Sequence, residues 1–267
     1  MALIQKFKSF AREKGELFLG NQTFLKTLLE RFGFCIVRNN TEKSIPSYPF
    51  RLVSLLNKHQ VTTVFDVGAC NGYYAADLRR LGYKNKIISF EPASKSYTAL
   101  LREANLFNDP LWIFYNIALG DVEEKKSMCI LDELPASSFL TPSQLHLHIN
   151  PKARGGVSEV VDVKRLETFY RLHCSASESV FLKIDTQGYE KQVLLGLGAL
   201  LEKITLIQLE VSFQSLYNGE IGFVDLLKFM KDRNFLPIDV DPMSFDSERG
   251  EFLQADILFR QTRPAVS

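Results

Sequence analysis

A β-branched, apolar run over residues 61–67 leads directly into the turn Gly-Ala-Cys-Asn-Gly at residues 68–72. The run is typical of a buried strand, and Asp66 stands next to its end. Glycines let the backbone of such a turn approach a ligand closely. A helix predicted over residues 73–81 would present its unpaired N–H groups at the same point. The segment therefore predicts a ligand site at the carboxyl end of a strand; the alternative is a tight turn that binds nothing.

The alternation of strand and helix continues along the rest of the chain. Further strands are predicted at residues 86–90, 112–119, 127–131, 157–163, 180–184 and 205–211, and further helices at 94–106, 166–173, 189–201 and 223–233. Residues 235–240 and 255–259 are predicted to form a closing hairpin, and residues 135–156 a long binding loop. Strands that alternate with helices indicate βαβ units. We therefore expect a Rossmann-like α/β domain over residues 61–267.

The first sixty residues have helical rather than strand periodicity, and we expect a helical N-terminal extension over residues 1–60. Its last helix is predicted at residues 50–59. Residues 1–40 hold seven basic and three acidic side chains, a net charge of +4. This charge allows weak contact with an anionic membrane surface. A solvated helix face that packs on the core is the alternative.

Composition narrows the class of protein. Lys and Arg number 32 against 31 Asp and Glu, and this balance argues against nucleic-acid binding, which needs a dense cationic surface. No apolar run approaches the roughly 20 residues of a transmembrane helix. The cysteines stand far apart, at positions 35, 70, 129 and 174. This spacing predicts neither a disulfide scaffold nor a metal site, and it favours a cytoplasmic location.

A second acidic residue indicates an adenosine-containing ligand. Glu91 ends the strand predicted at residues 86–90, about 20 residues after the glycine turn, where a carboxylate can bind both hydroxyls of a ribose. The dinucleotide pattern Gly-x-Gly-x-x-Gly is absent, because only Gly68 and Gly72 are present. Asp66 beside them would repel a pyrophosphate but suits a cationic ligand. The pattern therefore favours a sulfonium-bearing cofactor over the alternative of an NAD(P)-dependent oxidoreductase.

Four segments together resemble the motifs of the FkbM-type methyltransferase family. They are Phe-Asp-Val-Gly-Ala-Cys-Asn-Gly at 65–72, Phe-Glu-Pro at 90–92, Ala-Leu-Gly-Asp at 118–121 and Lys-Ile-Asp-Thr-Gln-Gly-Tyr-Glu at 183–190. The similarity runs from about residue 61 to 259, and the last segment is the most specific. The resemblance implies a class I methyltransferase fold, with a mostly parallel seven-stranded sheet flanked by helices and an antiparallel last strand. It also implies S-adenosylmethionine as the methyl donor and a hydroxyl as the acceptor.

The resemblance also implies which residues bind the donor. The glycine turn is expected to surround its methionine part, Glu91 its ribose, and residues 116–119 its adenine. The full set is Asp66, Gly68, Ala69, Asn71, Gly72, Glu91, Pro92, Asn116, Ala118 and Leu119. The chain departs from the family at Gln187, where an acidic residue is usual, and at Cys70, where a small or polar residue is usual. The first departure leaves a catalytically silent binding module as an alternative.

The acceptor side is expected where further strands end. Asp185 and Glu210 close the fourth and fifth strands of the predicted sheet, and ligands bind beyond such ends. Asp185 can take the proton of the acceptor hydroxyl or orient it, whereas the alternative for both carboxylates is local capping. Glu190 is expected to cap its helix.

The loop histidines add another candidate. His146 and His148 would share a face if the loop were extended, and either can act as a general base near neutral pH. No third ligand accompanies them, so no metal site is predicted. The catalytic candidates are Asp185, Glu210 and His148. The chain is expected to methylate a hydroxyl on a sugar, glycolipid or natural product.

Overall fold

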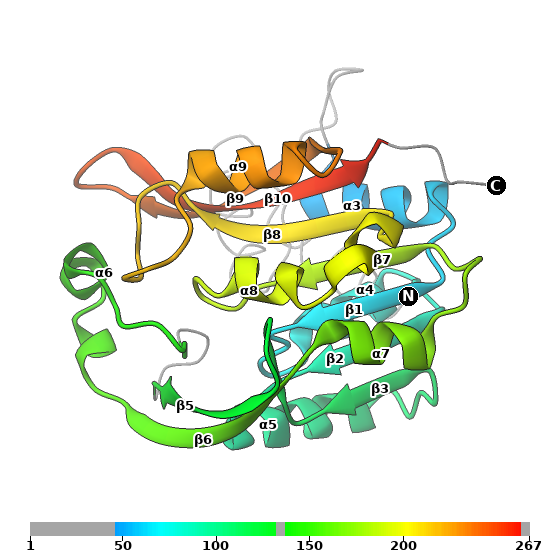
Figure 1. The fold of residues 1–267 in the computed structure, drawn as a ribbon, viewed down its shortest axis with the longest axis horizontal. Coiled ribbons are helices and arrows are strands. Elements are labelled where there is room, and N and C mark those ends of the chain that lie inside the picture. Colours follow the sequence, from blue (N-terminus) through cyan, green and yellow to red (C-terminus); the bar gives the residue numbers. More distant parts are fainter. Residues whose placement is uncertain (1–45, 132–136, 263–267) are drawn as a thin grey trace, which may run out of the picture. The chain divides into compact units, whose positions relative to one another are not determined.

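The computed structural model describes residues 46–131 and 137–262 (Figure 1). Most of the expected N-terminal extension therefore lies outside the described residues. Its last helix is present as α3, Tyr48–Lys58, and buries Leu52 and Leu56 in the core. The described residues from 47 onward form one compact unit, so α3 belongs to the α/β domain. No helix within the described ranges is long and apolar enough to cross a membrane.

A seven-stranded sheet forms the centre of the domain, in the order β3-β2-β1-β7-β8-β10-β9. The strands are β1 Thr63–Val67, β2 Lys86–Phe90, β3 Trp112–Tyr115, β7 Val180–Ile184, β8 Leu206–Ser212, β9 Phe235–Asp246 and β10 Glu251–Gln261. The first five in spatial order pair in parallel, whereas β10 is antiparallel to both β8 and β9. This topology confirms the predicted mostly parallel sheet. The closing hairpin is confirmed too, with longer strands than its apolar residues indicated.

Helices cover both faces of the sheet, as Figure 1 shows. On one face lie α3, α4 and α5, the last two at Tyr73–Arg80 and Ser94–Asn105. The other face carries α7 Leu166–His173, α8 Glu190–Leu195, the 3-10 helix η2 Gly198–Lys203 and α9 Phe223–Lys231. One helix was predicted over residues 189–201. It divides into α8 and η2 because Gly198 has a φ of +55°, outside the helical region.

A second, smaller sheet and two short helices correct two expectations. The sheet contains β4 Ala118–Leu119, β5 Glu124–Ile130 and β6 Val157–Lys164 in the order β4-β6-β5. The predicted single strand 112–119 is therefore wrong: its last residues pair with β6, because the chain turns at Asn116. The predicted loop 135–156 contains a short helix, α6 Gln144–Ile149, and the 3-10 helix η1 Pro151–Arg154.

A row of buried polar side chains crosses the main sheet beneath α4. Asp66 on β1 is in register with Ser89 on β2 and Lys183 on β7, and Lys183 is in register with Gln208 on β8. All four are at most 5% exposed. Lys183 Nζ lies 3.3 Å from Asp66 Oδ1, and the hydroxyl of Ser89 donates to Asp66 Oδ2 at 3.1 Å. The Tyr74 ring of α4 covers Lys183 at 5.2 Å.

The charge of Lys183 is maintained by its neighbours. Burial acts to lower the pKa of Lys183, but the carboxylates of Asp185, Asp66 and Asp256 raise it above its ordinary value. Burial raises the pKa of Asp66, which Lys183 opposes. The attraction between the two charges therefore offsets the free-energy cost of burying each of them.

Replacing Lys183 with Met should lower the free energy of unfolding by about 3–5 kcal/mol, because Asp66 keeps a buried charge without its cation. Urea unfolding at pH 7 would measure this loss. The double variant Lys183→Met/Asp66→Asn should recover a large part of it, and Lys231→Met on the exposed side of α9 serves as the control. Equal stability of Lys183→Met and Lys231→Met would contradict the importance of the pair.

Candidate functional site

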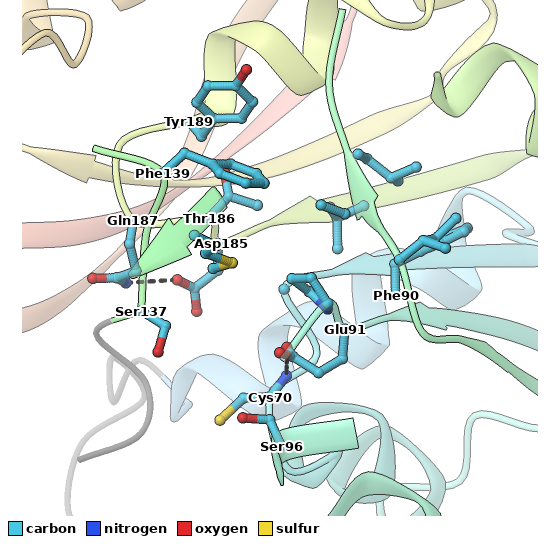
Figure 2. Close-up of a pocket in the computed structure, with 17 residues that line it drawn as sticks. Cys70, Phe90, Glu91, Ser96, Ser137, Phe139, Asp185, Thr186, Gln187 and Tyr189 are labelled. Carbon is cyan, nitrogen blue, oxygen red and sulfur yellow. Dashed lines mark hydrogen bonds between the residues drawn. The ribbon is translucent and has the colours of Figure 1, made fainter. Parts of the chain in front are cut away.

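A cavity opens at the carboxyl ends of β1, β2 and β7, with about 620 Å³ of space that includes solvent at its mouth. Figure 2 shows Glu91, Cys70 and Ser96 on one side of it, and Asp185 and Gln187 on the other. The position follows from the topology, because parallel strands bring their carboxyl ends to one edge. Among the described residues, no three His, Cys, Asp or Glu side chains form a metal site.

The glycine turn forms the bottom of this cavity. Gly68 has a φ of +74°, and a Cβ there would lie 1.9 Å from the carbonyl oxygen of Asp185. No other residue fits, so the turn and the end of β7 are in direct contact. The N–H groups of Gly68 and Ala69 donate to the carbonyl of Phe90, and Gly72 is the N-cap residue of α4. These bonds hold the turn against the end of β2.

Glu91 combines burial with access to the cavity. It is 6% exposed and lines the cavity, and its carboxylate accepts hydrogen bonds from the N–H groups of Cys70 and Ala93 at 2.8 and 2.9 Å (Figure 2). Burial raises the pKa of Glu91 to about 7, although these two N–H groups act to lower it. Each oxygen keeps a lone pair for a further donor. The carboxylate is therefore suited to bind paired hydroxyls.

The segment expected at the adenine has two functions in the structure. Ile117, Ala118 and Leu119 line the cavity with apolar side chains, and Pro92 lies with them. Asn116 instead points its amide to the backbone, donating to the carbonyls of Glu91 and Pro92 at 2.9 and 3.0 Å. It therefore fixes the turn that carries Glu91, and it does not line the cavity.

Four residues of the glycine segment that were expected at the donor do not line the cavity; they are Asp66, Ala69, Asn71 and Gly72. Asp66 is fully buried below the turn and pairs with Lys183, because its side chain points to the α4 face of the sheet. Ala69 is 3% exposed, and Asn71 accepts a hydrogen bond from the N–H of Tyr73. With Gly72, the N-cap residue of α4, these residues therefore shape the turn from behind.

The acceptor candidates Asp185 and Glu210 are brought together by Gln187. Gln187 Nε2 donates to Asp185 Oδ1 at 2.9 Å and to Glu210 Oε2 at 2.6 Å. Asp185 lines the cavity, whereas Glu210 stands behind it on β8. Burial raises the pKa of Glu210 well above its ordinary value, and the carboxylates of Asp185 and Glu190 raise it further. Glu210 is thus a buried acidic neighbour of Asp185, joined to it through the Gln187 amide.

The loop between β7 and α8 is held by Glu190. Its Oε1 accepts hydrogen bonds from the N–H groups of Thr186 and Gly188, both at 3.0 Å. Burial raises the pKa of Glu190 to about 7. Glu190 stands in the first turn of α8, as expected, but its carboxylate binds N–H groups of the preceding loop and does not cap the helix.

The histidines lie away from the cavity. Both belong to α6, where residues two apart point in different directions, so the expectation of a shared face is wrong. His146 is buried against the Tyr217 ring at 4.9 Å, and His148 is exposed. Neither lines the cavity, which removes the geometric support for His148 as a base.

Sequence reasoning missed one wall of the cavity. The rings of Phe139 and Tyr189 pack at a tilt with centroids 5.0 Å apart (Figure 2). Both line the cavity, together with Met128 of β5. Lys126 lies over both rings and donates to the hydroxyl of Tyr189 at 2.9 Å. Tyr189 lies inside the motif at 183–190, which is the one signal that marked it.

The sequence matches the family model described as "Methyltransferase FkbM domain" over residues 66–237. This range includes the glycine turn, Glu91 and the segment at residues 183–190. No curated protein matches the sequence.

Solved structures with a similar fold include methyltransferase FkbM from Methylobacillus flagellatus KT, at 12% identity and a TM-score of 0.43. The match covers 74% of this chain and 43% of that one, so the chain spans less than half of that protein. The rRNA methylase from Streptococcus thermophilus is 8% identical with a TM-score of 0.46, covering 82% and 100%. Magnesium protoporphyrin IX methyltransferase from Synechocystis PCC 6803, with bound SAM, is 10% identical with a TM-score of 0.43, covering 92% and 100%.

Glu91 should make stability depend on pH. Its folded-state pKa is raised to about 7 from an ordinary value near 4.5, so the protonated form favours the folded state. The stabilisation by the protonated Glu91 carboxyl is fully present below pH 4.5 and is lost as the pH rises to about 7. The stability of the wild type relative to Glu91→Gln should therefore fall by roughly 3 kcal/mol over that range. Urea unfolding of both proteins at half-unit pH steps tests this, and a constant difference would contradict it.

Proposed function

The chain belongs to the FkbM methyltransferase family, and we propose that it transfers a methyl group from S-adenosylmethionine to a hydroxyl oxygen. The proposed acceptor is a sugar, a glycolipid or a natural product. One observation carries this proposal: a single cavity presents Glu91 and Asp185 on opposite sides of the Gly68 turn. One carboxylate suits the ribose of the donor, and the other suits the proton of the acceptor. The family assignment argues against the nicotinamide-dependent alternative.

The donor side of the proposal rests on three features that fit an adenosyl group. The glycine turn brings backbone close to the cavity, Glu91 offers lone pairs to two hydroxyls, and residues 117–119 give an apolar wall for a base. When bound, the donor supplies a methyl group activated by its sulfonium. The residues of the chain then have to orient the acceptor oxygen at roughly 3 Å from that carbon and exclude water.

Asp185 is the proposed proton acceptor. It ends β7, lines the cavity and is held by Gln187, so its carboxylate is fixed at the cavity wall. Taking the hydroxyl proton as the new bond forms contributes typically 100- to 10,000-fold. Because Asp185 is present and anchored, the silent-module alternative has less support.

The wall composition favours an uncharged acceptor. Among the described residues, the ionisable side chains that line the cavity are Glu91, Asp185, Cys70 and Tyr189, and no Lys, Arg or His is among them. A phosphate group would meet carboxylates there without a cation, which supports a neutral hydroxyl compound over a nucleic acid. The free thiols of Cys70, Cys129 and Cys174 support a reducing compartment such as the cytoplasm.

The protein should bind S-adenosylmethionine and S-adenosylhomocysteine in the presence of a chelator. Glu91→Gln removes one charged acceptor from the ribose, so both affinities should fall roughly tenfold to a hundredfold. Titration calorimetry with EDTA in the buffer measures both. Glu248→Gln, on the exposed β9–β10 turn, is the control. If the wild type gives no heat at millimolar donor, the proposed function fails.

Asp185→Asn should separate chemistry from binding. Asn keeps the shape and accepts a hydrogen bond but cannot take a proton, so turnover should fall at least ~100-fold with donor affinity nearly intact. Release of S-adenosylhomocysteine on a panel of alkyl glycosides and polyol natural products provides the assay. A loss confined to the acceptor KM would assign orientation instead of proton transfer. Wild-type kinetics in the variant would refute both roles.

A further inference from the structure

The side-chain amide of Gln187 uses both of its N–H groups between two carboxylates. Nε2 donates to Asp185 at 2.9 Å and to Glu210 at 2.6 Å, while Oε1 accepts from the hydroxyl of Tyr217 at 2.8 Å. An amide nitrogen carries two hydrogens, so each carboxylate receives one. The arrangement leaves Asp185 Oδ2, 3.5 Å from Lys183, as the oxygen that Gln187 does not bind.

Several contacts fix the orientation of this amide. Gln187 has a φ of +55°, unusual for a residue other than glycine, and its carbonyl accepts a hydrogen bond from the hydroxyl of Ser138 at 2.7 Å. Tyr217 is 1% exposed and is packed against His146. The hydroxyl of Tyr217 can donate or accept, whereas an ionised Asp185 can only accept, so the amide turns Nε2 to Asp185 and Tyr217 donates to Oε1. The backbone and Tyr217 then hold the amide in this orientation.

The surroundings explain why an amide is suited to this position. The acidic groups nearby come from β7, β8, α8 and β10, and one cation faces them from β7. These groups are Asp185, Glu210, Glu190, Asp256 and Lys183. A carboxyl group at position 187 can donate a hydrogen bond only while it is protonated. It would then compete with Asp185 for a proton, whereas an amide donates without exchanging one.

We propose that Gln187 is a positioning residue, which holds Asp185 by one oxygen and keeps its other oxygen available to take the acceptor proton. Tyr217 holds the amide from its other end, and the neutral Gln187 adds no further ionisable group between Asp185 and Glu210. This inference rests on the proposed function in assigning the proton acceptor. The contacts themselves are testable in the free protein.

The first test measures the side-chain NH2 signals of Gln187 by ¹H–¹⁵N NMR in the free protein, assigned by their loss in Gln187→Glu. Both protons should exchange slowly, lie downfield of exposed amides and move as Glu210 titrates. Tyr217→Phe should speed their exchange, whereas Tyr73→Phe on the exposed start of α4 should not. Signals at the position of a solvated amide in the wild type would overturn the proposal, whether or not Tyr217→Phe folds.

The second test uses calorimetry to measure how a charge at position 187 changes ligand affinity. S-adenosylmethionine carries one positive charge more than S-adenosylhomocysteine, so Gln187→Glu should raise the affinity ratio of the two by about threefold or more at pH 8. This increase in the affinity ratio should become smaller toward pH 5.5, because the new carboxyl is protonated there. Gln187→Met, similar in length and uncharged, is the matched control. An unchanged ratio in folded Gln187→Glu would overturn the charge argument.

The two tests distinguish failure of this inference from failure of the proposed function. If the wild type binds neither compound, the proposed function fails, and the NMR signals still decide whether Gln187 holds the two carboxylates. If both compounds bind but the amide signals are those of a solvated side chain, the proposed function survives and the positioning role fails.

Discussion

The ammonium group of Lys183 joins the two halves of the site. Its Nζ donates to the carbonyl of Gly68 at 3.0 Å and lies 3.3 Å from Asp66 and 3.5 Å from Asp185. The first two contacts fix the turn after β1, and the third reaches the end of β7. Because the group is almost fully buried, these interactions act without the screening of water. The distance between the two sides of the cavity, marked by the Gly68 turn and by Asp185, therefore depends on one cation.

The periodic pattern of the sequence predicted the main sheet well, for a physical reason. The run at residues 180–184 is buried on both faces, so every position is apolar or has a buried partner, and the pattern has no competing interpretation. The segment at residues 112–119 is equally apolar, but its pairing changes from β2 to β6 at Asn116. A change of partner within an apolar run depends on tertiary contacts, which local pattern does not contain.

The difference between local pattern and tertiary contacts also explains which site residues the sequence predicted. Glu91 and Asp185 end strands, and the position of a strand end at the cavity follows from topology alone, so both were found. Asp66 stands one residue before such an end, and the alternation of side chains along a strand directs it to the opposite face. Gln187 was noticed only as a departure from a family pattern. Its role depends on Tyr217, thirty residues later in the chain, and no spacing rule connects the two.

The second sheet forms its strand pairs independently of the main sheet. β5 and β6 pair with each other and with β4, and none of them belongs to the main sheet (Figure 1). Met128 and Phe139 reach the cavity from this region, whereas Gly68 and Glu91 belong to the turns that follow β1 and β2. The pairing of the seven strands of the main sheet therefore does not involve β5 or β6. In evolutionary terms, the side chains at positions 128 and 139 can change one wall of the cavity while the turn that carries Glu91 is inherited unchanged.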